Sequence, residues 1–373
     1  MKEKWKQAGI EYRDFIFLGI AGLGIIFLYR RVGQKAAKGM SLVFQVGLGE
    51  EAGIPVRMAP LAIGCTWMTH LFGGSAGREG VAIQIGAAVS SNVERLIGKW
   101  WRLRERKQIF LITGMAAGFA GLFRTPLTAV FFAMEVLVVG ELEYSALLPA
   151  TVAAVTADFL AGKLGVARFH SEIALDVSMN LGLLLKLALL GILFGLAGFL
   201  FSEGLCRMRQ GLHRLFLDHP YRRIAIMGAV LAVLMILLWQ GRYSGTGSNL
   251  VQACFSGEGI YWYDWILKAL LTILTLASGF VGGEVAPLFS IGASLGFVLA
   301  PLFGISTGLA AALGYAAVFG SGTNTLLAAI LVGGEVFGYG TIPCMAVTCI
   351  MAHLMNRNHS IFSAQKILPH GLH

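Results

Sequence analysis

A glycine-rich stretch between two apolar segments carries the residue types best suited to chemistry. It reads Gly-Gly-Ser-Ala-Gly-Arg-Glu-Gly-Val over 73–81 and joins apolar segments at 56–71 and 82–97. A glycine-rich turn that opens a helix points free backbone N–H groups and the positive helix end at one spot, which suits an anion. Glu79 places a carboxylate inside that spot, and an ionisable residue at membrane depth predicts a functional role. The alternative interpretation is a tight hairpin outside the membrane whose charges are only solvated.

The composition indicates an integral membrane protein. Of the 373 residues, 56% are hydrophobic and 13% are charged, whereas soluble domains carry about 25% charged residues. Apolar segments recur along the chain, but several are shorter than the roughly 20 residues of a simple spanning helix and are broken by Gly or Pro. Paired, interrupted segments of this kind are typical of transporters built from repeats, whose binding site lies at the breaks.

The net charge of +9 comes mainly from three basic clusters. Basic loops beside apolar helices normally mark the cytoplasmic side of a membrane protein, so we expect all three clusters on that side. Nucleic-acid binding is the alternative for such a run, and the apolar context disfavours it. The clusters are Arg30, Arg31, Lys35 and Lys38; Lys99, Arg102, Arg104, Arg106 and Lys107; and Arg207, Arg209, Arg214, Arg222 and Arg223.

No pattern in the sequence predicts a metal or a cofactor. The five cysteines form no CxxC pair and lie mostly in apolar context, which indicates packing rather than a disulfide framework or a metal site. His70 has no HExxH pattern and no nearby ligand partner, so we expect a hydrogen-bonded packing residue. The glycine-rich runs match neither a P-loop nor a dinucleotide-binding fingerprint.

The second half of the chain repeats the first half. The segment Gly282–Pro287 stands where Gly77–Ala82 stood, and five further residues recur 200 positions later. Those five are Phe119, Leu127, Ala129, Glu135 and Val136, which return as Phe319, Leu327, Ala329, Glu335 and Val336. We therefore expect a polar lead-in at 1–13, membrane repeats of inverted topology at 14–160 and 180–362, an inter-repeat connection at 161–179 and a short tail at 363–373.

The broken helices of two such repeats would meet near the middle of the membrane. Helix starts at Met40, Gly77–Val81 and Val285–Pro287 then converge, and their backbone N–H groups bind an anion strongly enough to dehydrate it yet weakly enough to release it. Pro287 fits the first helical position. Desolvation favours the protonated form of Glu79, whereas the helix end favours its charged form. A carboxylate poised between these effects competes with the anion when charged and leaves when protonated, which couples anion movement to proton movement.

The alternative for Glu79 is a purely structural pair with Arg78. Glu284 is either a second proton-carrying group or the ion-pair partner of a basic residue, and we favour the ion pair. Glu135 and Glu335 end repeat-related helices, where carboxylates are commonly solvated. Glu135 is also a candidate for taking protons from the cytoplasm.

These motifs resemble the CLC family of anion channels and anion/proton antiporters over essentially the whole chain. Residues 77–81 are similar to the family's Gly-Arg-Glu-Gly-Pro motif, which supplies the external gating glutamate, with Val81 at its proline. Gly39-Met40-Ser41-Leu42-Val43 falls on the early Gly-Ser-Gly-Ile-Pro motif, with Met40 at its anion-contacting serine. Residues 283–287 fall on Gly-x-Phe-x-Pro, and Val136 falls on the inner proton-transfer glutamate. Together these forms resemble the fluoride/proton antiporter branch.

The resemblance implies an all-α membrane protein, a CLC-like inverted-repeat bundle with broken and re-entrant helices. It implies a multi-pass homodimer of the cell inner (plasma) membrane that exports fluoride in exchange for protons. It also implies that the protein has no cofactor, metal or nucleic-acid partner and no enzymatic activity. Glu79 is the implied gating and proton-coupling residue. The implied anion-binding residues are Met40, Ser41, Gly77, Arg78, Gly80, Val81, Val285, Ala286 and Phe362, and the candidates for the proton path are Glu135 and Glu284.

Three features depart from the family pattern. Phe362 falls at the family's anion-coordinating tyrosine, so only ring-edge contact with an anion is left. Ala286 stands where the fluoride branch usually has threonine. Both changes predict altered ion affinity or coupling. One membrane helix precedes Met40, where the family has about three helical elements, so we expect a truncated start.

Two rival functions stay open at this point. A CLC-type chloride/proton antiporter or passive chloride channel shares the same motifs. An intramembrane hydrolase would use His70, Ser75 and Glu79, but this requires an oriented nucleophile and base, and the spacing matches no recognised triad.

Overall fold

A computed structural model describes residues 15–97, 107–173, 179–217, 219–238, 241–257, 259–356 and 358–367. The predicted lead-in at 1–13 and most of the second basic cluster lie outside these ranges. The first half contains α3 (Leu18–Leu28), α4 (Met40–Gly47), α5 (Met58–Leu71), α6 (Glu79–Ile97), α7 (Lys107–Phe123), α8 (Pro126–Glu135) and α9 (Leu147–Lys163). The second half contains α10 (Leu181–Leu215), α11 (Pro220–Leu237), α12 (Ser248–Ser256), α13 (Asp264–Ala277), α14 (Val285–Phe303), α15 (Thr307–Thr323), α16 (Leu327–Phe337) and α17 (Ile342–Asn356).

The fold is an all-α bundle, as the sequence predicts. Among the described residues, four helices are long and apolar enough to cross a membrane, over Tyr144–Lys163, Leu181–Leu215, Pro220–Leu237 and Val285–Phe303. Other apolar helices are too short for a simple span, as α7, α8 and α16 illustrate. Such short helices at membrane depth require neighbours that satisfy their backbone ends.

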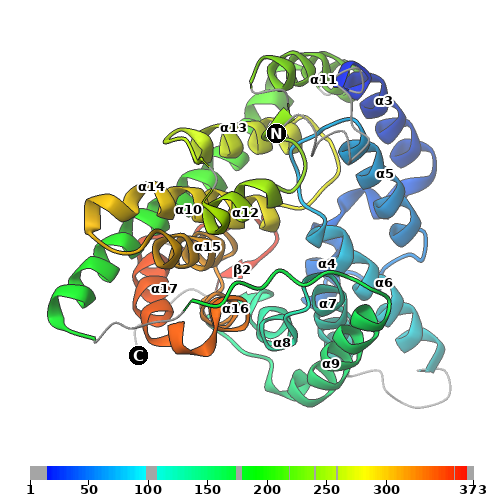
Figure 1. Ribbon diagram of the computed structural model, residues 1–373. Coiled ribbons are helices and arrows are strands. Elements are labelled where there is room, and N and C mark those ends of the chain that lie inside the picture. The colour runs from blue at the N-terminus through cyan, green and yellow to red at the C-terminus, as the bar shows by residue number, and fades with distance from the viewer. Residues whose placement is uncertain are drawn as a thin grey trace.

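Helices α4 to α9 and α12 to α17 follow the same order in the two halves, and Figure 1 shows α8 and α16 meeting between them. The packing is repeated as well. A Cβ built on Gly86 of α6 would lie 2.0 Å from the Gly114 carbonyl oxygen of α7, and one built on Gly292 of α14 would lie 2.0 Å from the Gly314 carbonyl oxygen of α15. Glycine at these crossings lets the two backbones touch, which is the usual basis of tight packing between membrane helices.

The chain before α4 differs in detail from the predicted apolar helix over Phe15–Arg30. Helix α3 ends at Leu28, a π-helical turn covers Tyr29–Gly33, and a 3₁₀ turn covers Gln34–Lys38. Gly39 then takes a positive φ of 56° and starts α4. Gly247 also takes a positive φ, of 83°, before α12, so a glycine with positive φ precedes each of these two helices.

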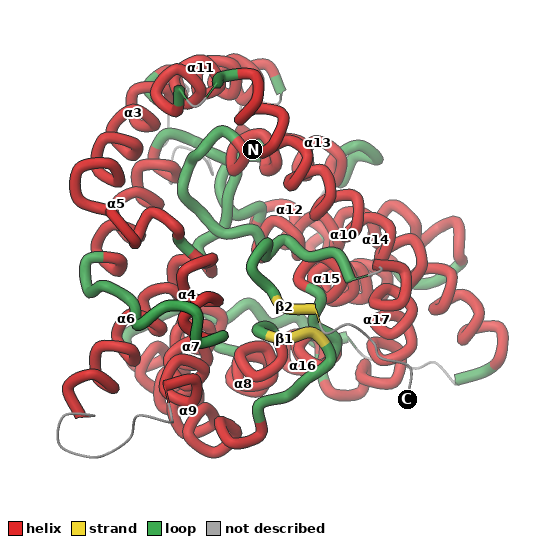
Figure 2. Tube along the Cα trace, turned by 180° about the vertical axis from the view of Figure 1, so that it is seen from behind, coloured by secondary structure: helices red, strands yellow, loops and turns green. Residues whose placement is uncertain are grey.

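The end of the described chain returns to the middle of the molecule. Strand β2 (Lys366–Ile367) pairs in parallel with β1 (Val138–Val139), which follows α8 directly. Figure 2 shows this short ribbon beside α8 and α16. The pairing fixes the segment that carries Phe362 against the repeat interface.

Candidate functional site

The loops that precede α6 and α14 cross as a short antiparallel bridge. The N–H of Gly77 donates to the carbonyl of Gly283 at 2.7 Å, and the N–H of Gly283 donates back to Gly77 at 2.9 Å. A Cβ built on Gly282 would lie 2.4 Å from the Cβ of Ala76. Glycine is therefore required for the approach, which brings the N-termini of the two helices together.

The carboxylate of Glu79 occupies the place expected for an anion. Oε1 accepts a 2.6 Å hydrogen bond from the backbone N–H of Ala286 in the first turn of α14, and Oε2 accepts one of 2.6 Å from the backbone N–H of Arg78. The side chain is 1% exposed. Arg78 contributes its backbone only, because its side chain points to the exposed surface. No ion pair joins Glu79 to the Arg78 guanidinium in the described chain.

The residues around the starts of α6 and α14 show one difference from the prediction. Val81 and Val285 are buried beside the crossing loops. Pro287 is the third residue of α14 rather than the first. Its missing N–H still falls within the first turn, where no intrahelical partner exists.

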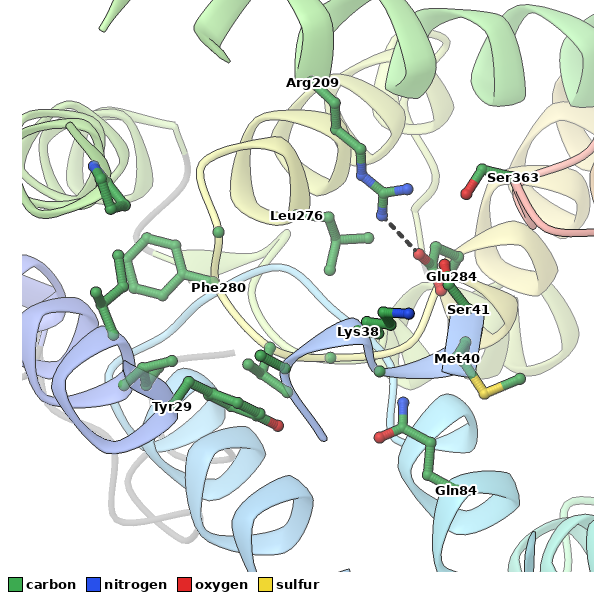
Figure 3. A pocket seen from close by; sticks show the side chains of 18 of the residues that line it. Tyr29, Lys38, Met40, Ser41, Gln84, Arg209, Leu276, Phe280, Glu284 and Ser363 are labelled. Atoms are coloured by element: carbon green, nitrogen blue, oxygen red, sulfur yellow. Dashed lines mark hydrogen bonds and ion pairs between the residues drawn. The ribbon is translucent and has the colours of Figure 1, made fainter. Parts of the chain in front are cut away.

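A cavity of about 680 Å³ lies next to this crossing (Figure 3). Met40, Ser41, Glu284 and Phe362 line it. A Cβ built on Gly80 would lie 3.9 Å from Cγ of Met40, so Met40 reaches from the cavity to the start of α6. The predicted site residues thus form two adjoining groups, one around the Glu79 carboxylate and one around the cavity.

Phe362 presents an apolar ring to the cavity. Its ring centroid lies 5.1 Å from that of Phe44 and 6.4 Å from that of Phe132. Backbone contacts hold the segment, since the Ile361 N–H donates to the Gly322 carbonyl at 2.9 Å and the Gln365 side-chain amide donates to the Val136 carbonyl at 2.9 Å. The ring is therefore held in place without a hydroxyl.

Glu284 forms the ion pair that the sequence favours. Its Oε1 lies 2.9 Å from Nη2 of Arg209 on α10, and this pair spans the cavity wall in Figure 3. Arg30, Lys38 and Arg223 also line the cavity, so residues of the first and third basic clusters gather around it.

The second basic cluster is represented by Lys107, which lines a pocket with Glu50 and Glu51. Glu51 also binds Lys35 at 2.7 Å and Lys38 at 3.1 Å. Hydrogen bonds from the two ammonium groups hold the pKa of the Glu51 carboxyl below its usual range. Through Glu51 the first basic cluster lies close to Lys107 of the second.

Glu135 and Glu335 differ from the expectation of solvated helix ends. Glu135 accepts hydrogen bonds from the backbone N–H groups of Leu326, Leu327 and Ala328 at the start of α16, at 2.5–3.2 Å. Glu335 accepts from the backbone of Leu127 and from both the backbone and hydroxyl of Thr128 at the start of α8, at 2.6–3.0 Å. Both side chains are buried, so each repeat caps a helix of the other, and Glu135 lies apart from the residues that line the cavity.

The hydrolase arrangement does not form. His70 Nε2 lies 3.1 Å from the Gly77 carbonyl oxygen, which is the packing role predicted for it. The Ser75 hydroxyl is hydrogen-bonded to Thr272 at 2.8 Å and accepts from Lys268 at 2.9 Å. Across the part of the chain that the structure describes, no cluster of His, Cys, Asp and Glu could hold a metal ion.

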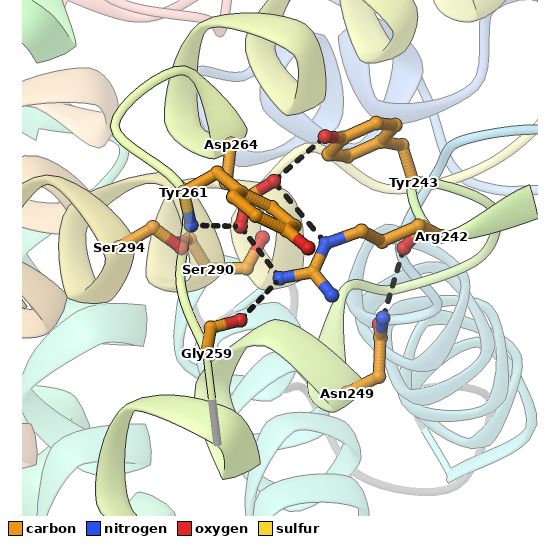
Figure 4. Close-up of polar contacts among 8 residues, drawn as sticks. All are labelled: Arg242, Tyr243, Asn249, Gly259, Tyr261, Asp264, Ser290 and Ser294. Carbon is orange, nitrogen blue, oxygen red and sulfur yellow. Dashed lines mark hydrogen bonds and ion pairs between the residues drawn. The ribbon is translucent and has the colours of Figure 1, made fainter. Parts of the chain in front are cut away.

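A buried polar cluster lies at the start of α13 and was not predicted from the sequence (Figure 4). Asp264 accepts from Arg242 at 2.6 and 3.2 Å, from the Tyr243 hydroxyl at 2.6 Å and from the Tyr261 backbone N–H at 2.9 Å. Lys268 follows one turn later and is equally buried. The sequence does contain a signal for this cluster, because Asp264 and Lys268 are two ionisable residues, four positions apart, that interrupt an otherwise apolar segment.

Comparison with known proteins gives consistent matches. The family model described as voltage gated chloride channel matches residues 21–357. A chloride/fluoride channel protein of Pseudomonas syringae pv. tomato is 35% identical, over 94% of this chain and 78% of the relative. An H(+)/Cl(−) exchange transporter, ClcA of Yersinia pestis, is 28% identical over 65% of this chain, and this chain spans about half of that relative, 53%.

Two solved structures similar to this chain are anion/proton antiporters. A structure titled as a CLC-type fluoride/proton antiporter superposes with a TM-score of 0.92 at 48% identity, covering 95% of this chain and 88% of the other. A slow cyanobacterial Cl⁻/H⁺ antiporter has the same fold, with a TM-score of 0.79 at 22% identity, covering 92% of this chain and 83% of the other.

Proposed function

Because this chain belongs to the voltage gated chloride channel (CLC) family, we propose that it is a secondary-active transporter that exports fluoride in exchange for protons. The observation that carries the proposal is the position of Glu79, whose carboxylate accepts the N–H of Ala286 at the start of α14. A helix N-terminus that holds a carboxylate offers the same donors to a small anion. Carboxylate and fluoride therefore compete for one place.

Protonation decides this competition. A charged carboxylate is stabilised by the N–H groups and the positive helix end, whereas a neutral carboxyl loses most of that stabilisation and is released from the site. Fluoride then takes the vacated N–H groups, and Glu79 carries its proton to the opposite side. When Glu79 returns in the charged form, it displaces the anion. Movement of the anion therefore requires movement of the proton.

The cavity lined by Met40, Ser41 and Phe362 supplies the second compartment of this pathway. Its basic lining raises the local concentration of anions. Its apolar wall offers fluoride few hydrogen bonds, which keeps the anion from being held there too strongly. Glu284 lies at the same cavity and is the candidate through which protons reach Glu79 from that side, while Glu135 stays a separate prediction for the proton path.

Export of fluoride fits the chemistry of the ion. Fluoride enters cells as its neutral weak acid and is trapped inside as the anion, so a proton gradient across the inner membrane can drive it out. We place the protein there as a multi-pass homodimer with one pathway per subunit, acting as a transporter and not as an enzyme.

The test is ion flux from liposomes that contain the purified protein, with a proton gradient imposed. We expect fluoride efflux well above chloride efflux, together with opposite proton movement. The variant Glu79→Gln should abolish proton movement, whereas Glu141→Gln, at an exposed carboxylate, should leave it unchanged. Chloride efflux equal to fluoride efflux would refute the fluoride assignment and favour a chloride transporter or channel. Proton movement that survives Glu79→Gln would exclude Glu79 as the coupling residue.

A further inference from the structure

Helix α13 presents one buried polar stripe to the loop that carries Glu79. The stripe consists of Asp264, Lys268, Thr272 and Thr275, which recur every three or four residues and are all 0% exposed. This spacing places them on one face of the helix. Because an apolar helix gains nothing from burying polar groups without partners, each member must serve a contact.

The Lys268 ammonium is bound by three neutral oxygen atoms. It donates to the Ser75 hydroxyl at 2.9 Å, to the Tyr243 carbonyl at 3.0 Å and to the Gly245 carbonyl at 2.7 Å. An ammonium has three protons, so its hydrogen-bonding capacity is filled. None of these partners carries a negative charge, whereas buried cations are normally paired with an anion.

Two of the three oxygen atoms that bind Lys268 lie in, or are hydrogen-bonded to, the loop that precedes Glu79. Ser75 lies in the loop just before Glu79. Gly245 is joined to the same loop, because its carbonyl accepts the Ala76 N–H at 3.2 Å and its N–H donates to Gly74 at 2.9 Å. The Lys268 ammonium is therefore held against the loop that leads into Glu79.

The neighbouring charged side chains, buried or half-exposed, are already balanced. Arg242 is paired with Asp264, and Arg209 is paired with Glu284. Among the contacts of the described chain, Lys268 is left without an anionic partner and Glu79 without a cationic one. The positive charge on α13 is thus available to whatever negative charge occupies the start of α14.

On this basis, and resting on the proposed function, we propose that Lys268 is an electrostatic positioning residue, the fixed countercharge of the anion site. When the Glu79 carboxylate occupies the site, Lys268 balances its charge. When protonated Glu79 leaves, the fixed charge stays and favours entry of fluoride. Exchange of carboxylate for fluoride then leaves the net charge of the site unchanged, which avoids the cost of an uncompensated buried cation at either stage.

The competing explanation is that Lys268 only braces the loop, as Thr272 does through its 2.8 Å hydrogen bond to Ser75. The experiment compares Lys268→Met, which removes the charge, with the double variant Ser75→Ala and Thr272→Val, which removes the contacts of the Ser75 hydroxyl and keeps the charge. Fluoride flux is measured in liposomes against internal fluoride concentration, so that KM and maximal rate are separated. Lys268→Arg tests for rescue by a retained charge.

We expect Lys268→Met to raise KM for fluoride by about tenfold or more, which corresponds to about 1.4 kcal/mol. The double variant should change KM less than about threefold, and Lys268→Arg should restore most of the affinity. An unchanged KM in Lys268→Met, or an equal rise in the double variant, would overturn the proposal. If Lys268→Met cannot be purified folded, adding Glu79→Gln should restore folding, because both buried charges are then removed. Failure of that rescue would also overturn the proposal.

The wild-type protein in the same liposomes separates the two proposals. Absence of fluoride/proton exchange in the wild type refutes the proposed function. If the wild type exchanges chloride instead, the same KM comparison is made for chloride. A tenfold rise in KM for chloride in Lys268→Met then supports the countercharge role, and an unchanged KM refutes it.

Discussion

Replacing Glu135 by glutamine distinguishes a helix cap from a proton carrier. The Glu135 side chain is 8% exposed, and its oxygens accept the N–H groups of Leu326, Leu327 and Ala328. Hydrogen bonds to a charged group contribute about 1.5–3 kcal/mol each, roughly twice the value for neutral pairs. A neutral amide keeps the shape, but its one oxygen accepts more weakly and its NH2 group cannot accept, so a buried N–H also loses its partner. We therefore expect Glu135→Gln to lower the free energy of unfolding by about 2–4 kcal/mol.

The assay pairs thermal unfolding in detergent with proton-coupled flux in liposomes. Glu203→Gln is the matched control, because Glu203 pairs with the exposed side chains of Arg207 and His359 at the surface of α10, and such pairs contribute less than about 1 kcal/mol each. For Glu135→Gln we expect a clearly lower melting temperature with an unchanged ratio of protons to anions. Unchanged melting together with lost proton coupling would refute the capping argument and make Glu135 part of the proton path.

Three further predictions concern other parts of the molecule. Gly292→Ala should give little folded protein, because its Cβ would lie 2.0 Å from the Gly314 carbonyl oxygen, and yield after gel filtration measures this. Asp264→Asn should lower the free energy of unfolding by about 3–5 kcal/mol, since it leaves the buried Arg242 without a countercharge, and thermal melting in detergent would detect the loss. Phe362→Tyr should lower KM for fluoride several-fold if the added hydroxyl reaches the anion, by about 1 kcal/mol per hydrogen bond, and concentration-dependent flux measures it.

Much of the fold followed from patterns that repeat along the chain. The 200-residue offset between Glu135 and Glu335, and the match of Gly282–Pro287 to Gly77–Ala82, indicated two halves. The glycine match is a local feature, because close backbone approach requires glycine. The convergence of the helix starts at 77–81 and 285–287 followed in turn from assuming that the halves pack together.

The partners of the charged side chains could not be predicted in the same way. Whether Glu79 pairs with Arg78 or with the N–H of Ala286 depends on which way a side chain turns between two halves far apart in sequence. The cluster around Asp264 joins residues from three segments, and neither its spacing nor its composition indicates which of them meet. Long-range contacts between polar groups are set by packing, and a single sequence carries no direct signal for them.

The same interaction serves both a permanent contact and an exchangeable one in this protein. In each case a glutamate from one half accepts backbone N–H groups at the start of a helix in the other half. Glu135 is bound by three N–H groups of one helix, and its own helix ends there, so removing it would leave several buried donors without partners. Glu79 receives a single N–H from α14 and one from its neighbour Arg78, and it lies at the start of its own helix. Because so few donors would be lost, the proposed exchange requires only a rotation of the Glu79 side chain, after which a small anion would replace the carboxylate without rebuilding the fold.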